Sequence, residues 1–174
     1  MDPITLIKAA QQGDALVFEQ LVEMYYDDIY RIAYSWCGQK SDAEDIAQNA
    51  CIKLGQGIRQ YQFNSKFSTW LYRLVINCAK DWQRQNKHNN EEIEENNFID
   101  NSVAEMAIYL RQILACVEML GAEFKETVVL VLGEGLSHKE AAEILDVKES
   151  TISWRIHKVR NKLHEFNPDA GGQT

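Results

Sequence analysis

The interior of this chain contains no proline, and that absence constrains the fold more than any other feature of the sequence. The two prolines, Pro3 and Pro168, lie near the ends of the 174 residues. A proline within a helix removes a backbone hydrogen bond and clashes with the preceding turn, so this interior permits long helices. Apolar residues recur at three- and four-residue steps, whereas strand-like alternation is weak. We therefore predict an all-helical protein.

Capping residues indicate where these helices begin and end. Ser41, Ser102 and Ser137 are each followed three residues later by a glutamate, which is the pattern of a capping box. Gly38 and Gly121 follow apolar helical patterns and predict helix C-termini.

The helical segments group into two small domains on either side of a polar stretch. Three apolar stripes, within residues 18–36, 46–54 and 67–78, are expected to share one core. Residues 86–101 are asparagine-rich and acidic, with too little apolar surface to repay the entropy of ordering. We predict an N-terminal helical domain, a flexible acidic linker, a C-terminal helix-turn-helix domain and a flexible tail, at residues 1–88, 89–102, 103–166 and 167–174.

The helix-turn-helix is predicted from the stretch that begins at Leu136. Two short amphipathic patterns meet at a corner formed by residues 146–148, with small residues on the first and regularly spaced apolar residues on the second. A second helix of this kind fits the major groove of duplex DNA; the alternative is a helical hairpin with a solvated basic face. The residues predicted to face duplex DNA are Ser150, Thr151, Ser153, Trp154, Arg155, His157, Lys158 and Arg160.

A second basic surface is predicted in the N-terminal domain. Three cations and one amide recur at helical spacing opposite the apolar stripe of residues 67–78, after a loop that combines aromatic, short polar and charged side chains. Such a mixture suits unpaired bases, which stack on aromatic rings and expose their edges. The alternative is core packing, which we favour for Trp70 and leave open for Phe63. The residues predicted to contact unpaired DNA are Phe63, Asn64, Ser65, Lys66, Arg73, Asn77, Lys80 and Arg84.

The net charge of −8 argues against a nucleic-acid partner until charge is counted by segment. Residues 59–88 carry six basic and one acidic side chain, and residues 136–164 carry six and four. The intervening residues 89–135 carry two basic and ten acidic side chains. Positive charge therefore gathers in the two segments predicted to bind DNA, as phosphate contacts require.

Other classes of function are disfavoured by the sequence. It contains no glycine-rich phosphate loop, HExxH motif or nucleophile elbow, so we do not expect an enzyme. Four widely spaced cysteines predict buried thiols, and we expect neither a metal nor a cofactor. The longest apolar run, Val128 to Leu132, is too short to cross a bilayer, which favours a cytoplasmic protein.

The order and spacing of these motifs resemble a bacterial sigma factor of the extracytoplasmic-function (ECF) type, within the sigma-70 family. The resemblance extends from about Leu16 to about Phe166. Its most specific parts are Asp42-Ala43-Glu44-Asp45 with Gln48, then Trp70-Leu71 with Asn77, Asp81 and Arg84, and lastly Glu140-Ala141-Ala142 with Thr151, Arg155 and Arg160.

The resemblance implies a transcription initiation factor with two DNA-binding domains. In that family the first domain binds core RNA polymerase and the melted minus-ten element, with one flipped base held by the loop at residues 63–66, and the second domain binds the minus-thirty-five element as duplex. It further implies that the acidic linker follows the RNA exit path and that an anti-sigma factor sequesters the protein. The residues expected to bind polymerase are Asp45, Gln48, Asn49 and Lys53, a polar face that the residues alone leave undecided between solvent and a partner.

Two positions depart from the family pattern. The family often has an aromatic residue shortly after the position of Gln48, where this chain has Asn49-Ala50-Cys51. Trp154 lies where a small hydroxyl side chain is common in the family. The alternative function is a free-standing helix-turn-helix regulator that binds a symmetric duplex operator as a dimer.

Overall fold

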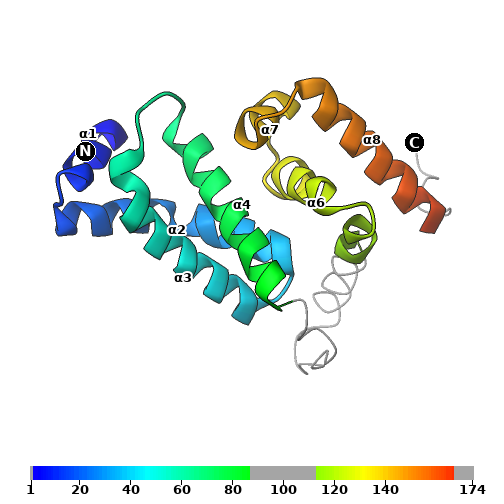
Figure 1. Ribbon diagram of the computed structural model, residues 1–174, viewed down its shortest axis with the longest axis horizontal. Coiled ribbons are helices and arrows are strands. Elements are labelled where there is room, and N and C mark those ends of the chain that lie inside the picture. The colour runs from blue at the N-terminus through cyan, green and yellow to red at the C-terminus, as the bar shows by residue number, and fades with distance from the viewer. Residues whose placement is uncertain (1, 87–112, 167–174) are drawn as a thin grey trace. The chain divides into compact units, whose positions relative to one another are not determined.

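The computed structural model describes residues 2–86 and 113–166, and every regular element in these ranges is helical (Figure 1). The chain divides into two compact units, Met1–Arg84 and Gln85–Thr174. Because the regular elements in the described ranges are all helices, the all-helical prediction is confirmed. The predicted acidic linker, the cap at Ser102 and the C-terminal tail lie outside the described residues. Within those ranges no helix combines the length and apolarity needed to span a membrane.

The first unit contains four α-helices and one short 3-10 helix. They are α1 (Pro3–Gln11), α2 (Ala15–Cys37), α3 (Lys40–Gly57), η1 (Ile58–Gln60) and α4 (Phe67–Asn86). The three predicted stripes meet in one core, with Trp36 of α2, Ile46 of α3 and Leu71 of α4 fully buried. Helix α1 adds Leu6 and Ile7 to this core, a contribution that the sequence analysis did not assign.

The connection from α2 to α3 confirms one predicted cap and corrects another. Gly38 adopts the left-handed conformation at φ 70°, and its N–H donates to the carbonyl of Tyr34 at 2.8 Å. The capping box at Ser41 is wrong, because the N-cap of α3 is Gln39, two residues earlier, and Ser41 lies within the first turn of the helix. Glu44, its expected partner, lies within the helix and pairs with Lys40 at 3.8 Å.

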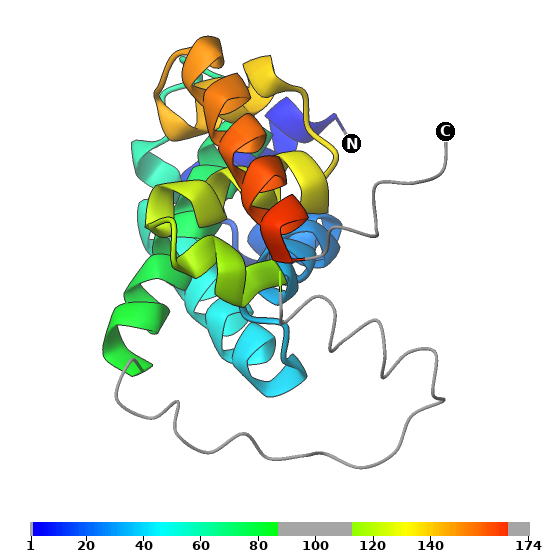
Figure 2. The same ribbon diagram turned by 90° about the vertical axis from the view of Figure 1, so that its right-hand side faces the viewer.

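The second unit contains the helix-turn-helix. Residues 113–118 are helical, followed by α6 (Ala122–Val128), a single π-helical turn η2 (Val129–Gly133), α7 (His138–Leu145) and α8 (Glu149–Phe166), with α7 and α8 joined at a sharp corner (Figure 2). Ser137 forms the predicted capping box with Glu140, and Asp146 ends α7 in the left-handed conformation. The side chains of Val117, Phe124, Val128 and Val159 form a buried cluster.

The seam between α7 and α8 is formed by one face of α7. The small residues Ala141 and Ala142 are buried in keeping with the sequence pattern, Ile144 is buried beside them, and Leu145 is half-buried. Ile144 follows Ala141 by three residues, so the two share a helix face. On α8, Ile152 and Ile156 are buried in agreement with the apolar spacing.

Candidate nucleic-acid interface

The loop between η1 and α4 holds its aromatic side chain in an exposed and unusual conformation. Phe63 is 39% exposed and has a φ of 58°, a left-handed value that bulky residues rarely adopt. Its ring lies 4.8 Å from that of Tyr61, measured between centroids. The Tyr61 hydroxyl donates to the carbonyl of Ser65 at 2.5 Å, which closes the loop on itself. Phe63 therefore lies at the surface, while Tyr61 anchors the turn.

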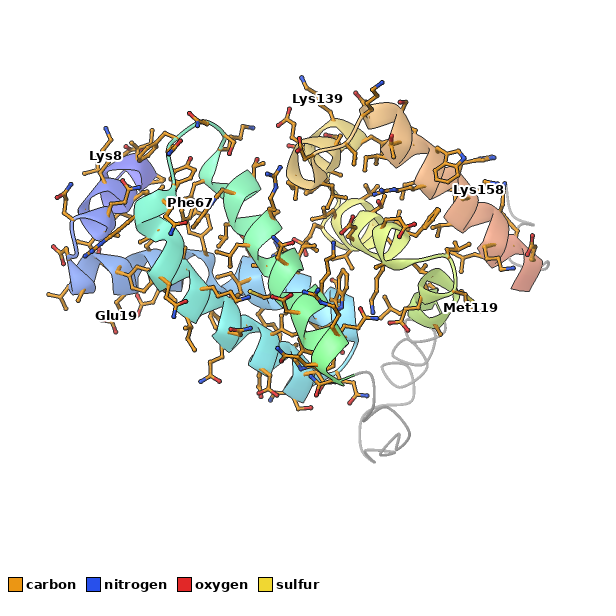
Figure 3. The ribbon with its side chains drawn as sticks, viewed as in Figure 1. Lys8, Glu19, Phe67, Met119, Lys139 and Lys158 are labelled. Atoms are coloured by element: carbon orange, nitrogen blue, oxygen red, sulfur yellow. The ribbon has the colours of Figure 1, made fainter. Side chains whose placement is uncertain are left out.

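An aromatic cluster beneath the loop joins it to the core. The Tyr61 ring is buried and lies 5.3 Å from Phe67 and 5.4 Å from Trp70. Figure 3 shows Phe67 at the first turn of α4, directed into the unit. Phe67 is buried and Trp70 is half-buried within this cluster, in keeping with the packing role favoured for Trp70. Asn64, Ser65 and Lys66 are exposed around Phe63.

The loop is also held by α1, through a residue that the sequence analysis missed. Gln11 donates from Nε2 to the carbonyls of Ile58 at 2.9 Å and Tyr61 at 2.8 Å. These partners lie 47 and 50 residues away along the chain, so no local sequence pattern links them. Satisfying two backbone acceptors fixes the point from which the loop departs.

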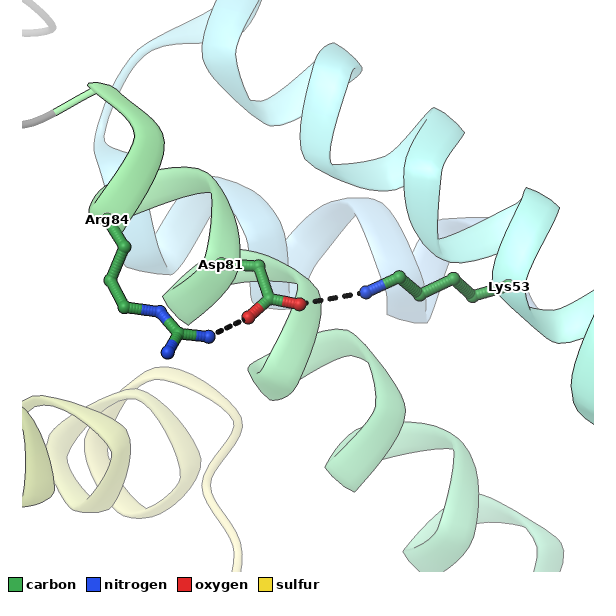
Figure 4. Close-up of polar contacts among 3 residues, drawn as sticks. All are labelled: Lys53, Asp81 and Arg84. Atoms are coloured by element: carbon green, nitrogen blue, oxygen red, sulfur yellow. Dashed lines mark hydrogen bonds and ion pairs between the residues drawn. The ribbon is translucent and has the colours of Figure 1, made fainter.

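The polar face of α4 continues from this loop along the helix. Arg73, Asn77 and Arg84 are exposed and Lys80 is half-buried, as the helical spacing predicts. Asp81 interrupts the positive charge, because it pairs with Arg84 on the same helix and with Lys53 Nζ of α3 at 2.8 Å (Figure 4). The side chain of Arg84 nevertheless remains 74% exposed.

Electrostatics at this bridge follow from its geometry. Hydrogen bonds from Lys53 and then Arg84 hold the pKa of Asp81 below its ordinary value, and the same contact with Asp81 raises the pKa of Lys53. Lys53, expected to bind polymerase, thus links α3 to α4. The other residues of its predicted set behave differently, since Asp45 and Gln48 are exposed and Asn49 is half-buried on α3.

The outer face of α8 brings together most of the residues predicted to face duplex DNA. Ser150, Ser153, Trp154, His157, Lys158 and Arg160 are all exposed, and Thr151 is half-buried. Trp154 is 51% exposed, with its ring 5.5 Å from Phe124 and the Lys158 ammonium 6.0 Å from its centre. Lys158 points away from the unit in Figure 3. Ser153 also meets His138 of α7 at 2.8 Å, which ties the two helices together.

Arg155, also expected to face DNA, instead turns toward α6. Its guanidinium donates to the carbonyl of Glu123 and to the hydroxyl of Thr127, both at 3.2 Å, and lies 3.6 Å from the Glu126 carboxylate. The side chains of Arg155 and Glu126 are only 11% and 10% exposed. Arg155 follows Ile152 by three residues and precedes Val159 by four, so its position beside the buried stripe was a signal of this role.

The described residues contain no cluster of histidine, cysteine or acidic side chains that would hold a metal ion. The candidate residues form two separate surfaces, one on each unit. The first is the loop with the α4 face, and the second is the outer face of α8. Both suit non-covalent recognition of nucleic acid through cations, amides, hydroxyls and aromatic rings.

Comparison with known proteins gives matches to both units. The family model described as Sigma-70 region 2 matches residues 21–89, and the model described as Sigma-70, region 4 matches residues 110–163. The chain is 30% identical to the ECF RNA polymerase sigma factor SigW of Bacillus subtilis (strain 168), over 91% of this chain and 93% of that protein. It is 27% identical to the ECF RNA polymerase sigma-E factor of Escherichia coli (strain K12), over 91% and 90%.

A solved structure shares the fold. The structure described as CnrH in complex with the cytosolic domain of CnrY has a TM-score of 0.70 at 24% identity, covering 98% of this chain and 99% of that chain.

Proposed function

The chain belongs to the ECF RNA polymerase sigma factors of the sigma-70 family, and from this premise we propose how its two surfaces divide the work of transcription initiation. The loop with the α4 face captures the melted minus-ten element. The outer face of α8 binds the minus-thirty-five element as duplex. Neither task requires bond chemistry, so we propose that the protein acts on promoters without catalysis of its own and works in the cytoplasm.

Strand opening is supported above all by the exposed ring of Phe63. Flipping a base from the duplex costs a few kcal/mol, and stacking on an aromatic ring returns about 1–3 kcal/mol per base. A ring held outside the core in a fixed conformation offers this stacking to an unpaired base, whereas a paired base remains inaccessible. Asn77 and Arg73 on the adjacent α4 face then supply an amide and a charge to the same strand.

Duplex recognition is assigned to the exposed side chains of α8. Lys158 and Arg160 bind phosphates or guanine edges, and Ser150 and Ser153 contribute hydroxyls near the start of the helix. Trp154 offers an apolar surface to a thymine methyl. We assign Arg155 to support of α8, because its guanidinium is occupied by α6.

Partner proteins follow from family membership. We propose that core RNA polymerase binds Asp45, Gln48 and Asn49 of α3. Lys53 supports this surface by holding α3 to α4 through its hydrogen bond to Asp81. An anti-sigma factor is proposed on the same ground. The alternative of a free-standing dimeric regulator is not favoured, because the sigma-70 region 2 model matches the first unit as well as region 4 the second.

The proposed division of labour is tested by run-off transcription with core polymerase on a promoter that has both elements. Phe63→Ala combined with Asn77→Ala should reduce permanganate reactivity of melted thymines and leave binding to minus-thirty-five duplex unchanged. Lys158→Ala should do the reverse. If the double variant opens the promoter as the wild type does, the loop and α4 face are not the melting surface.

A further inference from the structure

Helix α1 lies against the loop that carries Phe63, and its charge is placed for DNA. Lys8 is the only charged residue among residues 3–11, and its side chain is exposed. Its Nζ lies 5.7 Å from the centre of the Phe63 ring. Within the described ranges Lys8 has no carboxylate partner, so its charge is not neutralised by the fold.

A cation beside a stacking ring meets two demands of a single strand at once. Each nucleotide that stacks on an aromatic plane brings a phosphate with it, and single-strand binding sites combine rings with cations for this reason. Lys66 supplies one cation from the loop itself. Lys8 supplies a second cation from another element, beside the Phe63 ring.

The loop itself has an unfavourable backbone conformation that must be held in place. A left-handed φ is unfavourable at a bulky residue, and it persists only where the surroundings fix it. The Tyr61 hydroxyl restrains the far end of the loop at Ser65, and Gln11 restrains the near end through two carbonyls. Gln11 therefore acts on the direction in which Phe63 points.

We propose that α1 is part of the minus-ten site, with Lys8 binding the phosphate beside the base that stacks on Phe63 and Gln11 positioning the loop. This inference rests on the proposed function, in which that loop receives an unpaired base. It adds a helix that lies before the matched region 2 segment, which begins at residue 21.

The test of Lys8 uses holoenzyme, assembled from the full chain and core polymerase, on a promoter with a pre-melted minus-ten element. Lys8→Gln should reduce the slope of log affinity against log salt by about 0.7, the value for one lost single-strand phosphate contact. Lys8→Arg should retain the slope. Lys40→Gln is the control. It removes a positive charge at the start of α3, the end farther along the chain from the Phe63 loop, and should leave the slope unchanged.

The test of Gln11 measures base preference instead of affinity. Pre-melted templates carrying each of the four bases at each unpaired minus-ten position give a discrimination ratio for every variant. Gln11→Met keeps the side-chain length and removes both donated hydrogen bonds, and it should reduce discrimination roughly fivefold. Gln12→Met changes the exposed C-cap residue that follows Gln11 and should leave the ratio unchanged.

Each outcome bears on a different claim. An unchanged salt slope in Lys8→Gln overturns the phosphate contact, and an unchanged ratio in Gln11→Met, even with lowered thermal stability, overturns the positioning role. If wild-type holoenzyme shows no base preference at any unpaired position, the proposed melting function fails first.

Discussion

Arg155→Ala is expected to destabilise the second unit more than it weakens DNA binding. The substitution removes two hydrogen bonds from a charged donor and an ion pair with Glu126, in a site where both side chains are about nine-tenths covered. Breaking a buried pair by removing one partner costs about 3–5 kcal/mol. The 3.6 Å separation is longer than a hydrogen bond, so we expect the lower end, about 3 kcal/mol.

The assay is urea unfolding of the full chain, with hydrogen exchange of the α8 amides to localise the loss. Lys158→Ala, exposed on the same helix, is the matched control and should change stability by less than about 0.5 kcal/mol. Arg155→Met combined with Glu126→Leu should recover much of the loss, because an apolar pair avoids the unpaired charge. The reasoning is refuted if Arg155→Ala is as stable as Lys158→Ala and lowers the salt slope of duplex binding by about 0.9.

Substitutions at three positions test the ion pair, the cap and the duplex surface. Asp81→Asn should lower the free energy of unfolding by about 0.5–1 kcal/mol at neutral pH, a small value because its cationic partners are solvated. Since the folded pKa of Asp81 is lowered, this difference is present above its ordinary 3.8 and disappears as pH falls through the folded value, which urea unfolding between pH 7 and 2 measures. Ser137→Ala should lower the free energy of thermal unfolding by about 1 kcal/mol. Ser137→Thr keeps a capping hydroxyl and should lower it by much less. Lys158→Ala should reduce the duplex salt slope by about 0.9, and an unchanged slope assigns the residue to solvent.

Features that depend on residues close together in the chain were predicted correctly in most cases. The capping box at Ser137 and the left-handed Gly38 depend on neighbours within four residues, and both were predicted. The face of Arg73 and Asn77 follows from helical spacing alone. The box at Ser41 failed because the N-cap of α3 is Gln39, two residues earlier, and the two-residue connection after α2 left no extended residue at Ser41.

Contacts between distant segments were beyond local patterns. Nothing near Gln11 indicates that its amide meets carbonyls 47 and 50 residues further on. The orientation of Arg155 depends on the packing of α6 against α8, and a long side chain at the edge of a buried stripe can turn to either side. The roles of such residues follow from tertiary geometry, whereas the sequence supplies only their charge and helix face.

Helix α4 is fixed near both of its ends, which bears on how the melted strand would be bound. At its start, Phe67 and Trp70 pack on Tyr61, and Gln11 holds the carbonyl of that tyrosine. Near its end, Asp81 is tied across to α3 by Lys53. The polar side chains between these points therefore stand on a rigid support about 20 Å long. Ordering such a surface is a cost of folding and not of binding, so more of the stacking and phosphate energy is left to offset base-pair disruption.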